Sequence, residues 1–242
     1  METLHVGADG DMPPWCYIDE HGVYTGFDTE LVRLACARVG LRPVFHAIEW
    51  GKRDQLLADH VIDCVWSGFT VTGREHQYAI LGPYARNAIV VLADARLRKL
   101  DDLVGKIVVV QSGSSSETSL AKKGPNAALV SSFARLDRFP TVEICRDRLY
   151  ANMADAFAVD IDVARAFARK SNGRFAVIDD PPLRTEWIGA GFRLKDTALR
   201  DRLSRAVESL VADGTCARLS EKFFGDANLF DWKGNTRKEG GR

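Results

Sequence analysis

The sequence has no excess of charge of either sign. Its 33 basic residues are balanced by 33 acidic ones in a chain of 242 residues. A chain without net charge lacks the positive field that attracts nucleic acid or an anionic membrane. We therefore expect no nucleic-acid partner, and a ligand that is small and neutral or zwitterionic.

Cysteine pairs, long apolar runs and familiar catalytic motifs are also missing. The five cysteines are scattered without a CxxC pair, so neither a zinc site nor a disulfide framework is indicated. No stretch approaches the roughly 18 apolar residues of a membrane span, and neither GxSxG nor HExxH occurs. We expect no metal, no cofactor and no catalytic residue.

Short apolar runs alternate with amphipathic stretches, which is typical of α/β folds. Residues 4–8, 43–48, 62–66 and 87–94 are predicted strands, with helices between Gly26 and Gly40 and at 52–59. After a break at "LRKLDDLVGK" come strands at 107–110, 155–158, 175–178 and 188–194, and helices after Ser114, at 160–170 and at 196–214. The polar, glycine-rich stretch 233–242 is expected to be disordered.

The stretch "KIVVVQSGSSSE" is a valine-rich strand that ends in glycine and serines. Such a strand, buried on both faces, indicates a parallel sheet. Ser114 and Glu117 have the spacing of a helix capping box. The backbone N–H groups of a helix start also bind anions, so capping and an anion site both stay open here.

A second stretch, "WSGFTVTGREHQY", places Ser67, Gly68 and Thr70 close to Arg74. The guanidinium group of arginine matches a carboxylate, although a surface salt bridge is the common alternative. Trp15, Trp50 and Phe69 lie near predicted strand ends, where core packing and the wall of a ligand cleft are equally compatible with the pattern.

Five blocks of sequence together resemble a known family. They are "VGADGDMPPWCYIDEHGVYTGFDTELVRLACARVGL", "IDCVWSGFTVTGRE" with "GPY", "LDDLVGKIVVVQSGSSSE", "MADAFAVD" and "VADGTCARLSEKFFG". In this order they are similar to the bacterial extracellular solute-binding proteins of polar amino-acid ABC importers. The resemblance runs from about Leu4 to Gly225.

The resemblance implies a two-lobed type II periplasmic-binding-protein fold. Each lobe would be a mixed sheet flanked by helices, with the ligand in a cleft between the lobes that closes at a hinge. The first lobe would take residues 1–90 and 186–232, the second residues 91–185, and the tail residues 233–242.

The resemblance also implies a set of ligand-binding residues. Arg74 would clamp the α-carboxylate with Thr70 beside it, and Ser115 would add an N–H group. Gly68 and Asp160 would receive the α-ammonium. The positions that would shape the side-chain pocket are Asp9, Met12, Trp50, Ser67 and Gln111. Met12 stands where the family usually has an aromatic residue.

The implied function is capture of a free L-amino acid, with a basic or polar side chain, for the membrane subunits of an ABC importer. It would be performed by a monomeric, non-enzymatic protein at the periplasmic or extracellular face.

The start "METLHVGADG" has no signal-peptide pattern, which on its own predicts the cytoplasm. Two alternatives stay open: the sensing domain of a membrane receptor, and an enzyme resembling cyclohexadienyl dehydratase with Asp11 as its acid.

Overall fold

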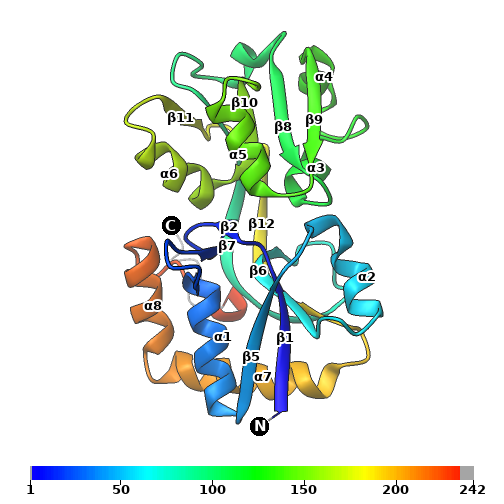
Figure 1. The fold of residues 1–242 in the computed structure, drawn as a ribbon, viewed down its shortest axis with the longest axis vertical. Coiled ribbons are helices and arrows are strands. Elements are labelled where there is room, and N and C mark those ends of the chain that lie inside the picture. The colour runs from blue at the N-terminus through cyan, green and yellow to red at the C-terminus, as the bar shows by residue number, and fades with distance from the viewer. Residues whose placement is uncertain (1, 235–242) are drawn as a thin grey trace, which may run out of the picture. The chain divides into compact units, whose positions relative to one another are not determined.

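The computed structural model describes residues 2–234, which form two compact units (Figure 1). Within this range the first unit contains residues 2–48, 53–86 and 186–234, and the second contains 49–52 and 87–185. Apart from the short segment 49–52, the chain passes from the first unit to the second along β7 (Ala79–Asp94) and returns along β12 (Arg184–Phe192). The lobe boundaries given above stay a prediction, and most of the tail, 235–242, lies outside the described residues.

The first unit is built on a mixed sheet with the strand order β5-β1-β6-β12. β1 pairs in parallel with β5 and β6, and β12 runs antiparallel to β6. The elements of this unit, apart from β7 and β12, are β1 (Glu2–Ala8), β2 (Asp11–Met12), β3 (Cys16–Ile18), β4 (Tyr24–Thr25), α1 (Phe27–Arg38), β5 (Leu41–Ala47), α2 (Arg53–Ala58), β6 (Cys64–Thr70), α7 (Thr197–Ala212), α8 (Thr215–Phe224) and the 3-10 helix η3 (Trp232–Gly234).

The second unit has a sheet in which β10 lies between β7 and β8, and β9 follows β8. β8 is parallel to β9 and β10, whereas β10 and β11 are antiparallel to β7. The elements are η1 (Trp50–Lys52), η2 (Leu100–Leu103), β8 (Ile107–Gln111), α3 (Ser115–Ser119), α4 (Ala127–Ser132), β9 (Arg135–Phe139), α5 (Val142–Tyr150), β10 (Ala156–Asp160), α6 (Ile161–Lys170) and β11 (Phe175–Ile178).

Helix α1 shows how the sequence sets an element of the first unit. Asp28 and Glu30 lie in its first turn and Arg38 in its last, which suits the helix dipole. Its apolar face is buried, and Gly40 follows the helix with a φ of 68°. Phe27 packs on an aromatic cluster that also contains Trp15, Tyr84, Phe224 and Phe230.

The second unit has its own core around β8, whose Val108, Val109 and Val110 are fully buried. The parallel, doubly buried strand expected from the valine run is therefore confirmed. Other buried residues of this core come from β7, β10 and β11, among them Ile89, Val91, Ala156, Ala158 and Ile178.

All five cysteines are buried free thiols. Between residues 2 and 234, no helix is both long enough and apolar enough to cross a membrane.

Candidate functional site

Arg74 follows β6 in the first unit, just after Gly73, which has a φ of 76°. Its Nη1 atom is buried without a hydrogen-bond partner, and no described residue forms a salt bridge with its guanidinium group. The guanidinium carbon lies 5.0 Å from the centre of the Phe69 ring. Burial, and then the charge of Arg53, lower the pKa of Arg74. Arg74 is therefore a partly buried cation whose Nη1 atom has no hydrogen-bond partner among the described residues.

Glu186 on β12 adds a negative charge to this part of the first unit, and no sequence pattern singles it out. It is only 4% exposed, and its Oε1 accepts a hydrogen bond of 2.6 Å from the Thr70 hydroxyl. Its charge raises the pKa of Arg74 and so offsets part of the effect of burial. Because the Thr70 proton points to Glu186, the Thr70 oxygen is left to accept a hydrogen bond rather than donate one.

Asp9, which directly follows β1, is a neighbour of Ser67 in the middle of β6. The Asp9 N–H group donates to the Ser67 hydroxyl oxygen at 3.1 Å, and Oδ1 of Asp9 accepts from the Asp11 N–H at 3.0 Å. Asp9 is buried, with 3% exposure. Its carboxylate thus orients the turn into β2, a role that aspartate often has in turns.

Gly68 needs to be glycine because its φ is 56° and a Cβ atom there would lie 3.1 Å from Cε of Met12. Its N–H group donates to Oδ2 of Asp28 at 2.7 Å, and the hydroxyl of Tyr84 donates to Oδ1, also at 2.7 Å. Burial raises the pKa of Asp28 to about 7, although both hydrogen bonds act in the opposite direction. A buried acid therefore fixes the Gly68 peptide.

For Trp15 and Phe69 the sequence allowed either core packing or a place in the wall of a ligand cleft. Both are fully buried in the first unit. Trp15 packs on Phe27 and Phe224, and Phe69 packs on Tyr78 and Arg74. Both rings thus belong to the packed interior.

In the second unit, Asp160 lies at the end of β10 and directly before α6. It occupies the N-cap position, but its side chain makes no capping hydrogen bond. Instead, Oδ1 accepts a hydrogen bond of 2.5 Å from the side-chain amide of Asn87. Asn87 thus orients the carboxylate, and the capping role does not explain the presence of an acid here.

Gln111 and Ser115 lie close in sequence where β8 turns into α3. Because β8 and β10 are adjacent and parallel, Gln111 and Asp160 end their strands at the same edge of this sheet. Ser114 caps α3 by accepting from the Glu117 N–H at 3.1 Å, so the capping interpretation is confirmed. The Glu117 carboxylate accepts from the N–H of Gly113 at 2.7 Å.

Trp50 also belongs to the second unit, in η1, and is 5% exposed. The other predicted site residues divide between the units: Asp9, Met12, Ser67, Gly68, Thr70 and Arg74 in the first, and Gln111, Ser115 and Asp160 in the second. Within residues 2–234, no group of three or more His, Cys, Asp or Glu residues has the arrangement of a metal site.

Known proteins resemble this chain over nearly its whole length. A probable amino-acid-binding protein of Bacillus subtilis, YxeM, is 29% identical over 231 residues, which are 93% of this chain and 84% of the relative. The L-cystine-binding protein TcyJ of Escherichia coli is 28% identical over 228 residues, with 92% and 83% covered.

A solved structure, Tv2483 bound to L-arginine, superposes with a TM-score of 0.85 at 26% identity and covers 94% of this chain and 92% of its own. The predicted α/β fold of the two-lobed binding proteins is thereby confirmed. The family model described as bacterial extracellular solute-binding proteins, family 3, matches residues 4–226. The chain belongs to this family of bacterial extracellular solute-binding proteins.

Proposed function

We propose that this protein captures a free L-amino acid on the periplasmic or extracellular face of the cell membrane and delivers it to the membrane subunits of an ABC importer. The observation that carries the proposal is the buried Nη1 atom of Arg74, which no described residue binds. The names of the relatives, one for L-cystine and one for amino acids, support the same ligand class.

The α-carboxylate of the ligand is the anion that Arg74 binds. A buried charge without a partner is costly, so a ligand that supplies the opposite charge recovers that cost on binding. A hydrogen bond to a charged group contributes about 1.5 to 3 kcal/mol. The nearby charge of Arg53, which lowers the pKa of Arg74, makes the local potential more positive and favours an anion further.

The α-ammonium needs acceptors, and the proposed residues supply them. Thr70 presents its oxygen as an acceptor because its proton is donated to Glu186. Asp160 of the second unit supplies a carboxylate that Asn87 orients. The first unit thus supplies Arg74 for the α-carboxylate and Thr70 for the α-ammonium, and the second supplies Ser115 and Asp160 for the same two groups.

The ligand side chain is proposed to be basic or polar. Asp9, Met12, Trp50, Ser67 and Gln111 are the residues assigned to it, and Asp9 is the only one of these five with a negative charge. Oδ1 of Asp9 also holds the turn at Asp11, so its charge has a structural role besides any contact with the ligand. The L-cystine-binding relative supports a ligand with a polar side chain. The solved structure with bound L-arginine supports a ligand with a basic one.

A thermal-shift screen of the twenty amino acids tests this function. Ligand at 100 times its dissociation constant stabilises a protein by about 2.7 kcal/mol. We expect at least one basic or polar amino acid to raise the melting temperature of the wild type but not of Arg74→Met. If all twenty, at millimolar concentration, leave the wild-type melting temperature unchanged, the proposed function is wrong.

A further inference from the structure

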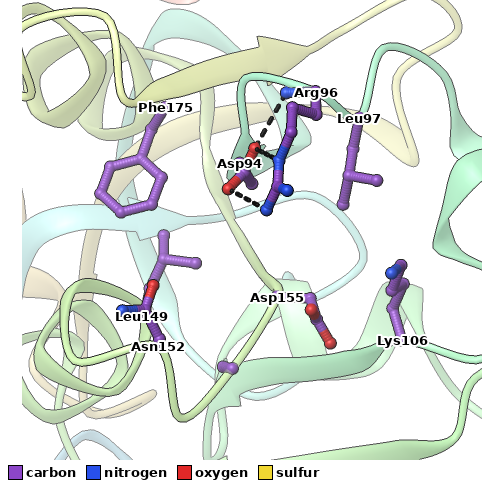
Figure 2. A pocket seen from close by; sticks show the side chains of 9 residues that line it. Asp94, Arg96, Leu97, Lys106, Leu149, Asn152, Asp155 and Phe175 are labelled. Carbon is purple, nitrogen blue, oxygen red and sulfur yellow. Dashed lines mark hydrogen bonds and ion pairs between the residues drawn. The ribbon is translucent and has the colours of Figure 1, made fainter.

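A pocket of about 480 Å³ lies in the second unit, apart from the residues assigned above (Figure 2). It is formed where β7 ends and where β8, β10 and β11 begin, beside the end of α5. We call it the strand-start pocket. Its lining residues are Asp94, Arg96, Leu97, Lys106, Leu149, Asn152, Ala154, Asp155 and Phe175.

The strand-start pocket and the proposed amino-acid residues lie at opposite edges of the same sheet. β8 begins at Ile107, next to Lys106, and ends at Gln111. β10 begins at Ala156, next to Asp155, and ends at Asp160. Because the two strands are parallel, the pocket is at their first residues and the proposed ligand-binding residues are at their last. A molecule in this pocket therefore occupies a separate site.

Lys106 is the charged group of the pocket that lacks a partner. It is partly buried, and its ammonium group forms no hydrogen bond or ion pair with any residue of the described chain. Asp155, by contrast, accepts a hydrogen bond from the Ile107 N–H at 2.8 Å. Asp94 is paired with Arg96, whose Nε and Nη2 atoms lie 2.9 and 3.0 Å from its two carboxylate oxygens. Lys106 is therefore the group that a ligand anion would meet.

The surrounding charges also favour an anion. Arg174 donates to the Asn152 side chain at 2.7 Å and to the Tyr150 carbonyl at 2.6 Å, and forms no salt bridge among residues 2–234. Its guanidinium carbon lies 4.7 Å from the centre of the Phe175 ring. The three cations Arg96, Lys106 and Arg174 outnumber the carboxylates of Asp94 and Asp155, which leaves the site positive.

On the side of the pocket away from Lys106, the apolar side chains of Phe175 and Leu149 lie beside Asn152. Figure 2 shows Phe175 and Leu149 on one side and Lys106 with Leu97 on the other, with the Asp94–Arg96 pair between them. Pockets of about 300 to 1,000 Å³ are typical of small-molecule sites. The volume and the two unlike walls suit a molecule with one charged end and one apolar end.

We propose that the strand-start pocket binds a small organic carboxylate with an apolar body. The carboxylate pairs with the ammonium group of Lys106, and the apolar body packs on Phe175 and Leu149. An inorganic or very small anion cannot pack on Phe175 and Leu149. A neutral molecule of the same shape cannot form the ion pair with Lys106.

Phenylacetate is the probe, with phenylacetamide and acetate as comparisons. Titrations followed by amide chemical shifts use the Arg74→Met protein, so that binding at the proposed amino-acid site is removed. We expect phenylacetate to bind at least tenfold more tightly than phenylacetamide or acetate. Lys106→Met should weaken phenylacetate binding at least tenfold, because it removes a charge-assisted bond. The control Lys123→Met, an exposed lysine of the same unit, should leave it unchanged.

Lys106→Gln provides a second neutral variant in case Lys106→Met folds poorly, and the melting temperature of each variant is measured first. Phenylacetate that binds Lys106→Met or Lys106→Gln as tightly as the parent overturns the proposal. So does equal binding of acetate and phenylacetate, which would show a general anion effect. Absence of phenylacetate binding to the Arg74→Met protein also overturns it, since the anion then binds at Arg74 or nowhere.

Discussion

Arg74 carries a buried charge that the rest of the described chain does not neutralise. In the ligand-free protein this charge costs free energy, which its contact with the Phe69 ring and the nearby charge of Glu186 offset only in part. We predict that Arg74→Met, which keeps the apolar stem, lowers the free energy of unfolding by no more than about 1 kcal/mol. Urea denaturation without ligand measures this.

Arg193 provides the matched control, because it is a buried arginine whose hydrogen bonds are satisfied. It binds Asp63 at 3.1 Å, Asp196, and the carbonyls of Leu57 and Ile62 at 3.0 and 2.6 Å. Arg193→Met should cost about 3 to 5 kcal/mol, because it leaves buried acceptors unpaired. If Arg74→Met is as destabilising as Arg193→Met, then Arg74 has a structural role.

Asp160 is predicted to distinguish α-amino acids from 2-hydroxy acids. A hydroxy acid lacks the ammonium, so the Asp160 carboxylate loses a charge-assisted hydrogen bond, at a cost of about 1.5 to 3 kcal/mol. Asp160→Asn should therefore reduce the preference for the amino acid at least tenfold, as measured by calorimetric titration of both ligands. The control is Asp162→Asn in the same first turn of α6, which should keep the wild-type ratio. An unchanged ratio in Asp160→Asn would show that the ammonium binds elsewhere.

At the scale of elements, Asp28 joins α1 to β6 and β7 through its hydrogen bonds with Gly68 and Tyr84. Its pKa in the folded protein is about 7, above the usual value of 3.8. Between these values the folded state keeps a proton that the unfolded state has lost. The contribution of this proton to the free energy of unfolding is thus fully present below about pH 4 and is lost as the pH rises through 7.

We predict that the wild type loses about 1 to 3 kcal/mol more stability than Asp28→Asn between pH 5 and pH 8. Asparagine has no proton to lose, and taking the difference between the two proteins cancels the contributions of other groups. Urea denaturation at both pH values measures the effect. Equal pH dependence in the two proteins would place the pKa of Asp28 outside this interval.

Elements with a strong apolar pattern were predictable from the sequence, and weakly patterned ones were not. The prediction at 175–178 coincides with β11, and α1, β8 and α6 lie close to their predicted positions. Strand β9, "RLDRF", was missed because it has charged residues and no fully buried position. Helix α5 was also missed, although Val142, Cys145 and Leu149 are buried at helical spacing and Thr141 caps the helix.

The candidate site was predictable only in part, for a physical reason. Gly68 and Arg74 lie in one short stretch, so their spacing is visible in the sequence. Glu186 meets Thr70 from 116 residues away, and only the pairing of β12 with β6 brings the two strands together. Asn87 meets Asp160 from 73 residues away in the same manner, through the pairing of β7 with β10.

At the scale of the whole molecule, composition indicated a chain without net charge, and the alternation of apolar runs and amphipathic stretches predicted an α/β protein. The resemblance predicted the fold of nearly the entire chain. The family match over residues 4–226 confirms that fold for both units. The first unit contains the cation Arg74, whose Nη1 atom is buried, and the second contains the carboxylate of Asp160, which Asn87 orients. This distribution suits a ligand with both charges, which is the zwitterionic form of a free amino acid.

The most direct test of this account compares an amino acid with its α-amide by calorimetric titration. The ligand is the amino acid that gives the largest thermal shift, and its amide keeps the ammonium and the side chain but has no carboxylate. We predict that the wild type binds the amide at least 100-fold more weakly, which corresponds to about 2.7 kcal/mol, and that Arg74→Met shows little preference between the two. Amide binding within threefold of the amino acid in the wild type would contradict the assignment of the α-carboxylate to Arg74.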